Sequence, residues 1–238
     1  MKKLFFVLSF IFAAQTINAQ LFTKEKIQNQ ANIDKMKYSW GYYLGFNSYD
    51  FNFDYNQDRD DIQVEKTLGF NVGLVGNMRI NDHLDLRMEP GLIISRRNLI
   101  YDESYFQGID FNPSDLIREV NSTYIHFPLL VKFSAKRFNN IKPFVVGGFS
   151  AALNLSSNEE NPDDNTVGQF RTKRGMLFYE LGVGIDLYLF WFKFTPSIRG
   201  VFALNDELIR DNDNANSPWT SNVHTMKTRG LFINFTFQ

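Results

Sequence analysis

Hydrophobic and polar side chains alternate along most of this chain, in eight separate runs. In each run, every second residue is aliphatic or aromatic, and the residues between are mostly glycine, polar or charged. A period of two puts one set of side chains on each face of a β-strand. The runs are about as long as a tilted strand needs to be to cross a bilayer. We expect eight strands, near residues 39–46, 67–80, 84–95, 124–133, 145–154, 177–187, 192–204 and 230–237.

The two faces of these runs differ in a way that indicates a membrane barrel. One face is almost uniformly apolar, which suits lipid. The other combines glycine with charges of both signs, which suits a narrow lumen filled by ion pairs. A soluble β-sandwich or lipocalin-like barrel is the alternative, but it would bury its apolar face inside. The charged residues predicted to face the lumen are Arg79, Asp85, Arg87, Glu89, Lys132, Glu180, Asp186, Lys193, Arg199 and Arg229.

The connections between the runs alternate in length as well. Short joins lie near 81–83, 134–140 and 190–191, and long polar joins lie near 48–66, 98–119, 156–174 and 205–223. Outer-membrane barrels have short periplasmic turns and longer external loops. An even number of strands then leaves both termini in the periplasm. The predicted fold is all-β, a closed eight-stranded antiparallel transmembrane β-barrel of the outer-membrane type with meander topology.

Two aromatic features refine this prediction. The stretch 49–55 alternates out of phase with Trp40–Phe46, so we expect a β-bulge near Asn47–Ser48 and a strand that projects beyond the membrane. Aromatic residues also gather where interfacial belts are expected. The periplasmic belt would contain Trp40, Tyr188, Phe190, Trp191, Phe192 and Phe237, and the residues in or near the external loops are Tyr101, Tyr105 and Trp219.

The N-terminus has the form of a secretory signal peptide. Lys2 and Lys3 precede an apolar run that is too short for a membrane helix, and small residues follow. We expect cleavage after Ala19, which divides the chain into a signal peptide at 1–19, a periplasmic segment at 20–37 and the barrel at 38–238. The polar segment could reach periplasmic partners or could be disordered. The sequence has no cysteine, so lipidation and disulfides are not expected.

Composition and charge narrow the class of partner. The 25 phenylalanines, 10 tyrosines and 3 tryptophans, beside only 7 prolines, favour an all-β protein. The net charge of the full chain is −1, and loss of Lys2 and Lys3 with the signal peptide makes it about −3. A nucleic-acid partner is not expected, because phosphate binding on that scale needs a basic footprint.

A search for catalytic or metal-binding patterns is mostly negative. Three scattered histidines without cysteine do not form a zinc site. Gly182-Val183-Gly184 lies inside a predicted strand and lacks the strand–turn–helix context of a phosphate loop. Asp211–Asn214 lacks the later ligands of a calcium loop. We therefore predict no cofactor and no catalytic, cofactor-binding or metal-binding residue, although the acidic external loops could hold divalent cations weakly.

One group of residues contains the types that a serine hydrolase uses. His224 with Ser217 or Ser221, and an acid such as Glu207 or Asp211, would lie near the outer rim, where a lipid hydrolase needs a base-activated serine. Any polar loop contains such residues, and no nucleophile motif supports them, so we do not expect an enzyme. The lumenal His126 is expected to be a hydrogen-bonded interior residue.

Several segments resemble a Bacteroidota outer-membrane β-barrel family. They are Thr123–Phe133, Leu86–Leu92, Lys142–Gly148, Tyr179–Gly184 and the signal ending at Asn18–Gln20, so the match covers nearly the whole mature chain. The opening Ser39–Phe51 is similar to the PorT branch of that family. The C-terminal Phe237-Gln238 departs from the terminal aromatic common among barrels.

The resemblance implies a function and partners. PorT barrels belong to the type IX secretion system, which exports cargo proteins and is linked to gliding motility in some members. It implies a non-enzymatic accessory or scaffold barrel that contacts other outer-membrane and periplasmic proteins of that machinery, and outer-membrane lipid. Because side chains are expected to fill the lumen, we do not expect the barrel itself to be the pore. A structural or adhesion barrel, and less so a rim lipid hydrolase, are the alternatives.

Overall fold

The computed structural model describes residues 28–160, 170–211 and 217–238, so the expected signal peptide lies outside the described residues. Short 3₁₀ turns occur at η1 (Ile33–Lys35), η2 (Glu103–Phe106) and η3 (Pro113–Leu116). No helix in these ranges is long and apolar enough to cross a membrane. The strands are β1 (Tyr38–Tyr55), β2 (Gln63–Lys66), β3 (Leu68–Arg79), β4 (Leu84–Met88), β5 (Gly91–Ile100), β6 (Ile117–Ser134), β7 (Ile141–Asn154), β8 (Gly175–Tyr188), β9 (Lys193–Ala203) and β10 (Val223–Phe237).

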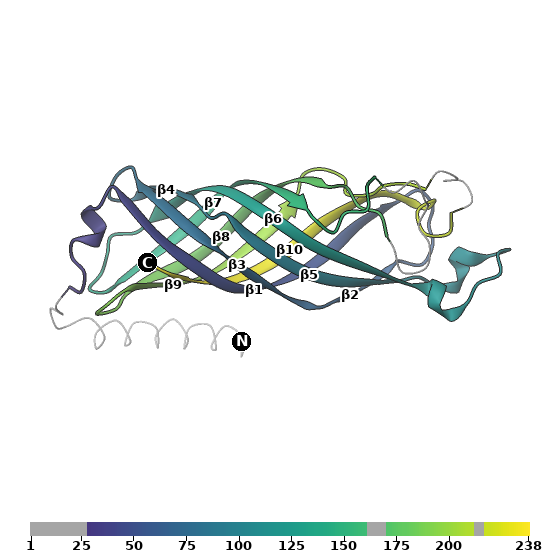
Figure 1. Ribbon diagram of the computed structural model, residues 1–238, viewed down its shortest axis with the longest axis horizontal. Helices are drawn as coiled ribbons and strands as arrows, with labels where there is room; N and C mark the ends of the chain where they lie inside the picture. The colour runs from purple at the N-terminus through teal and green to yellow at the C-terminus, as the bar shows by residue number, and fades with distance from the viewer. Residues whose placement is uncertain (1–27, 161–169, 212–216) are drawn as a thin grey trace, which may run out of the picture.

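The ten strand segments make up the eight full-length strands of one closed barrel, which we call staves (Figure 1). Thr67 separates β2 from β3, and Glu89-Pro90 separate β4 from β5, so each of these pairs is one interrupted stave. Antiparallel pairing runs from β1 through β10, β9, β8 and β7 to β6, and then to β4 and β5. The pairing of β1 with β3 closes the ring. The predicted eight-stranded antiparallel meander is confirmed.

The two faces of the wall are divided as the alternation predicts. Large apolar side chains stand on the outside, with Trp40 73%, Leu68 71% and Phe149 67% exposed. A continuous apolar surface of this kind is unfavourable in water and suits the hydrocarbon of a bilayer. The charged side chains from Asp85 to Arg199 in the predicted lumenal set are buried inside. Arg79, the last residue of β3, shares the face of Asp85 at the end of the barrel and pairs with Asp82. One member of the set is placed differently, because Arg229 points outward and pairs with Asp50.

The barrel continues beyond the apolar belt on the side of the long loops. Strand β1 keeps one register against β10 from Tyr42↔Phe237 to Asp54↔Thr225, so the bulge expected near Asn47–Ser48 is wrong. The side chains on the two faces exchange character instead. Tyr49 and Phe51 turn inward and are 0% and 3% exposed, while the outward positions become polar. The change of phase therefore marks the point where the outer environment changes from lipid to water.

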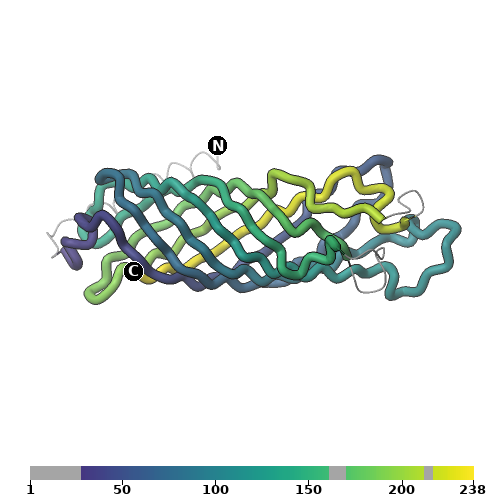
Figure 2. Tube along the Cα trace, turned by 45° about the horizontal axis from the view of Figure 1, so that its top comes forward, coloured from purple at the N-terminus to yellow at the C-terminus, as the bar shows by residue number. Residues whose placement is uncertain are grey.

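The turns and loops follow the predicted alternation, and they place the two ends of the barrel (Figure 2). Residues 80–83, 135–140 and 189–192 form short turns at one end, together with both ends of the barrel domain. Trp40, Phe190 and Trp191 are exposed there, as an interfacial belt requires. Tyr188 was predicted for that belt, but it is 2% exposed and points into the barrel mouth. Tyr101 and Tyr105 are likewise buried, in a core at the other end.

Candidate functional site

An ion-pair network fills the middle of the lumen. Arg199 on β9 is its centre: Nη2 lies 2.8 Å from Glu89 Oε2, and Nε lies 3.1 Å from Glu180 Oε2. Arg87 donates to the other oxygen of Glu89, and His126 Nε2 lies 2.9 Å from Glu180 Oε1. Every side chain here is at most 5% exposed. Buried charges are destabilising unless they are paired, and this network places an opposite charge beside each carboxylate.

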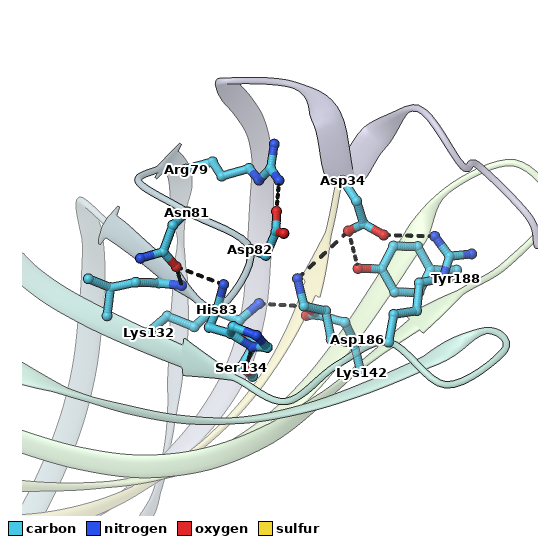
Figure 3. Close-up of polar contacts among 12 residues, drawn as sticks. Asp34, Arg79, Asn81, Asp82, His83, Lys132, Ser134, Lys142, Asp186 and Tyr188 are labelled. Carbon is cyan, nitrogen blue, oxygen red and sulfur yellow. Dashed lines mark hydrogen bonds and ion pairs between the residues drawn. The ribbon is translucent and has the colours of Figure 1, made fainter.

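A second ion pair lies closer to the short turns (Figure 3). Lys132 Nζ is 2.6 Å from Asp186 Oδ2, and Thr195 donates to Asp186 Oδ1 at 2.7 Å. Lys132 also lies over the ring of Phe144, 4.1 Å from its centroid. These residues come from four different strands, β6 to β9. These contacts therefore link four neighbouring strands, which form one half of the barrel wall.

Tyrosine rings complete the packing, and glycines make room for them. A Cβ added to Gly91 would lie 2.1 Å from the hydroxyl of Tyr43, and one added to Gly73 would lie 2.6 Å from the same ring. Tyr43 is 2% exposed. An eight-stranded barrel has an interior just wide enough for its own side chains. The lumen at this level is consequently occupied by protein.

The end of the barrel at the long loops is closed by a hydrophobic core. Phe51, Leu99 and Val120 project inward from the extended strands and meet Tyr101, Tyr105 and Phe106 of the loop that follows β5, with further members Ile62, Phe170, Leu208, Val223 and Met226. Trp219 lies against this core, where its Nε1 donates to the Asp115 carbonyl and Arg118 lies over its ring at 4.1 Å. This end of the barrel is packed like the core of a soluble domain.

The described part of the N-terminal segment folds against the opposite end. Asp34 accepts a hydrogen bond from the Tyr188 hydroxyl at 2.5 Å and pairs with Arg137 at 2.9 Å, while Lys142 lies 3.9 Å away (Figure 3). The guanidinium of Arg137 lies over the Tyr188 ring at 3.6 Å. Asn29 bonds to Asn140 and to the Tyr188 carbonyl. Residues 28–37 are therefore docked on the periplasmic mouth. Sequence reasoning missed this contact, since no periodicity marks a short polar segment.

The structure does not bring the hydrolase constellation together. Glu207 is 0% exposed and accepts from the Tyr124 hydroxyl at 2.6 Å and from Thr228. Asp211 pairs with Arg171 at 3.2 Å and accepts from Ser217. The exposed His224 is held through its carbonyl, which accepts from Arg210 at 2.7 Å. Both acids thus act as structural partners, and no described contact joins His224 to a serine.

The lumenal histidine and the glycines of the sixth predicted strand lie where the sequence predicts them. His126 faces the lumen, as expected, and Gly182 and Gly184 lie inside β8. In the described ranges, no group of three or more histidine, aspartate or glutamate side chains is arranged to hold a metal ion. Residues 212–216 of the calcium-like loop lie outside the described residues.

The lipid-facing wall contains a hollow of about 750 Å³ near the periplasmic half of β6 to β10. The β8–β9 ladder is interrupted here, between Gly184↔Ser197 and Leu187↔Phe194. The interruption coincides with Pro196, which has no N–H to donate. The lining includes Phe133, Pro143, Val145, Ile185, Pro196, Ile198 and Ile233.

A second, polar hollow of about 320 Å³ opens in the wall between β1 and β2. The β1–β3 ladder ends at Ser48↔Leu68, whereas β1 continues to Tyr55 against β10 and β2 pairs with β5. The two staves therefore separate above that level. Asp50 bridges the base of the opening: it pairs with Lys66 at 3.0 Å and with Arg229 at 2.9 Å.

Comparison with known proteins places the chain in a family. Residues 18–208 match the family described as "Outer membrane protein beta-barrel domain". No curated protein matches the sequence.

Solved outer-membrane barrels are similar to the chain over most of its length, at low identity. The outer membrane protein OprG from Pseudomonas aeruginosa has 12% identity and a TM-score of 0.46, with 83% of this chain and 94% of OprG covered. Neisserial surface protein A has 10% identity and a TM-score of 0.40, covering 84% and 98%. Ail, the attachment invasion locus protein of Yersinia pestis, has 11% identity and a TM-score of 0.39, covering 85% and 99%. The family match spans more than half of the sequence, and the chain therefore belongs to the outer-membrane β-barrel domain family and is a protein of the outer membrane.

Proposed function

We propose that this barrel is a non-enzymatic accessory or scaffold component of the type IX protein secretion system, acting beside the translocation pore. Within the family, the opening Ser39–Phe51 is the segment similar to PorT barrels. The filled lumen is the observation that supports a role beside the pore and not as the pore itself. Arg199, Glu89 and Glu180 occupy its middle, and a packed core closes its outer end. A folded cargo protein has no path through such a barrel.

The surfaces that remain for a scaffold are the lipid-facing wall and the two ends. The hollow around Pro196 gives the wall a concave apolar surface that side chains of a neighbouring membrane protein can fill. The docked segment at 28–37 presents a folded periplasmic face, with Asp34 holding it to Arg137. Other outer-membrane and periplasmic proteins of the secretion machinery are the proposed partners. Any effect on gliding would follow from failed export of adhesins or from a direct contact.

The test is the secreted proteome of a clean deletion strain beside its complemented parent. We expect cargo proteins with type IX sorting domains to accumulate in the periplasm of the deletion strain. The full-length barrel should also co-purify with a much larger assembly. Unchanged secretion would overturn the proposal and leave a barrel of another role.

Surface adhesion is the second candidate, and one observation favours it. The loop after β5 projects past the rest of the barrel (Figure 1), and between η2 and η3 it exposes Ile109 and Phe111 by 45% and 36%. An adhesin would lose cell attachment when both are changed to serine, with secretion intact.

The division of the chain is proposed as a signal peptide at 1–19, a periplasmic segment at 20–37 and the barrel at 38–238. Mass measurement of the mature protein checks it, because cleavage after Ala19 makes Gln20 the first residue.

A further inference from the structure

The outward side chains of four neighbouring staves change from mostly apolar to charged near the long loops. Leu231, Ser48 and Leu68 lie side by side on β10, β1 and β3, and on β5 the outward residue before the change is Ile94, which pairs with Phe70. Two residues further toward the long loops along each stave are Arg229, Asp50, Lys66 and Arg96. The edge of the apolar belt on this side therefore coincides with a row of charges.

This row carries an excess of positive charge. Asp50 pairs with both Arg229 and Lys66, whose side chains are still 52% and 47% exposed. Arg96 donates through Nε to Asn121 at 3.1 Å and pairs with Glu119 at 3.6 Å, and its side chain is 59% exposed. Lys227 lies two residues beyond Arg229 toward the loops, on the same face of β10, and Glu65 lies one residue beyond Lys66. Four cations thus meet three carboxylates, and the next acid on β1, Asp54, lies further toward the loops.

The charged row also borders the polar hollow between β1 and β2. Lys66 and Arg229 line this hollow of about 320 Å³, and its other polar lining residues are Asp50, Asn52, Asp61 and Gln63. Cations, amides and a strand edge that has no partner in the described wall provide hydrogen-bond donors and acceptors on one surface. A pocket of this volume falls at the lower end of the range of small-molecule sites.

We propose that this row and hollow bind the phosphorylated sugar headgroup of a glycolipid in the outer leaflet. The long loops are external, so the row lies at the outer edge of the hydrocarbon, where lipid phosphates lie. Arginine suits phosphate because its planar guanidinium donates two parallel hydrogen bonds. The long aliphatic stems of lysine and arginine can cover apolar surface while their charges reach the headgroups. The proposal rests on the outer-membrane location and not on the secretion role.

The opposite wall differs in the residues that the structure describes. Its outward positions near the long loops include Leu153, Leu177 and Leu204, all exposed. The exposed Arg174, directly before β8, lies next to Glu160. A bound headgroup would thus fix how the barrel is oriented toward its lipid neighbours.

The test is native mass spectrometry of the full-length purified barrel with bisphosphorylated lipid A as the probe. Arg96→Gln combined with Arg229→Gln removes two exposed cations, and heat-modifiable mobility on gels checks that the barrel still folds. Arg174→Gln is the matched control, because Arg174 is also 59% exposed and lies 3.8 Å from Glu160. We expect the double variant to retain lipid A about tenfold less well than the wild type, as the loss of charge-assisted hydrogen bonds predicts. The control should bind like the wild type.

Further arms separate the sources of phosphate. Dephosphorylated lipid A and phosphatidylglycerol should bind about tenfold less well than bisphosphorylated lipid A. Inorganic phosphate should not displace it at equal concentration. Equal retention by the double variant, equal binding of either comparison lipid, or displacement by inorganic phosphate would each overturn the proposal. Loss of wild-type binding on chelation of divalent cations would also overturn it, by assigning the contact to metal on the acidic loops.

Discussion

The central arginine of the lumen offers a quantitative test of how this barrel is held together. Arg199 is 4% exposed and contacts two carboxylates, Glu89 at 2.8 Å and Glu180 at 3.1 Å. Arg199→Met keeps most of the aliphatic volume and removes the charge. Glu89 then retains only Arg87 among these partners, and Glu180 retains His126.

The expected magnitude follows from burial. Removing one partner of a buried ion pair costs about 3–5 kcal/mol, because an uncompensated charge stays inside. The matched control is Arg229→Met, since Arg229 makes two hydrogen bonds to Asp50 but its side chain is 52% exposed. An exposed pair is worth about 0–1 kcal/mol. The two arginines have similar bonds and differ in their surroundings.

The assay is urea unfolding of the barrel in lipid vesicles, followed by heat-modifiable mobility and tryptophan fluorescence. With a slope of about 2 kcal/mol per molar urea, the midpoint of Arg199→Met should fall by about 1.5–2.5 M. Arg229→Met should move it by less than about 0.5 M. Adding Glu180→Gln to Arg199→Met should recover part of the loss, because one of the stranded charges disappears. Equal midpoint shifts for the two arginine variants would refute the claim that lumenal ion pairs hold the wall together.

Three other predictions concern the ends of the barrel. Phe51→Ala should destabilise the outer extension by about 3–5 kcal/mol through the cavity it leaves, and hydrogen exchange should rise near Leu99 and Val120 while the membrane-embedded strands stay protected. Asp34→Asn should release residues 28–37 from the mouth, because Tyr188, Arg137 and Lys142 lose a shared carboxylate; faster tryptic cleavage after Lys35 and Lys37 measures this, and an unchanged rate would contradict the docking. Burial raises the pKa of both Tyr101 and Tyr105, so the closed outer core keeps its stability below the unfolded tyrosine pKa of about 10 and loses it as the pH rises above that value. Trp219 fluorescence should report that opening, and Tyr101→Phe should reduce its pH dependence.

Alternation by itself determined the architecture. A period of two assigned Trp40, Leu68 and Phe149 to the lipid face and Lys132, Glu180 and Arg199 to the lumen, because a strand can only present successive side chains to opposite faces. The lengths of the joins determined which end carries the long loops. These features are local, and a closed ring is the arrangement that satisfies them together in a membrane.

Only the tertiary structure decided which residues meet across the barrel. Arg229 shares its parity with Leu231, but its outward position became clear only when the register showed that it stands beyond the apolar belt, opposite Asp50. The inward aromatic side chains of β1, such as Phe51, needed the loop after β5 to complete their core, and Asp34 needed Tyr188, 154 positions away. Such contacts depend on the closure and stagger of the whole ring, and these are properties of no single stretch of sequence.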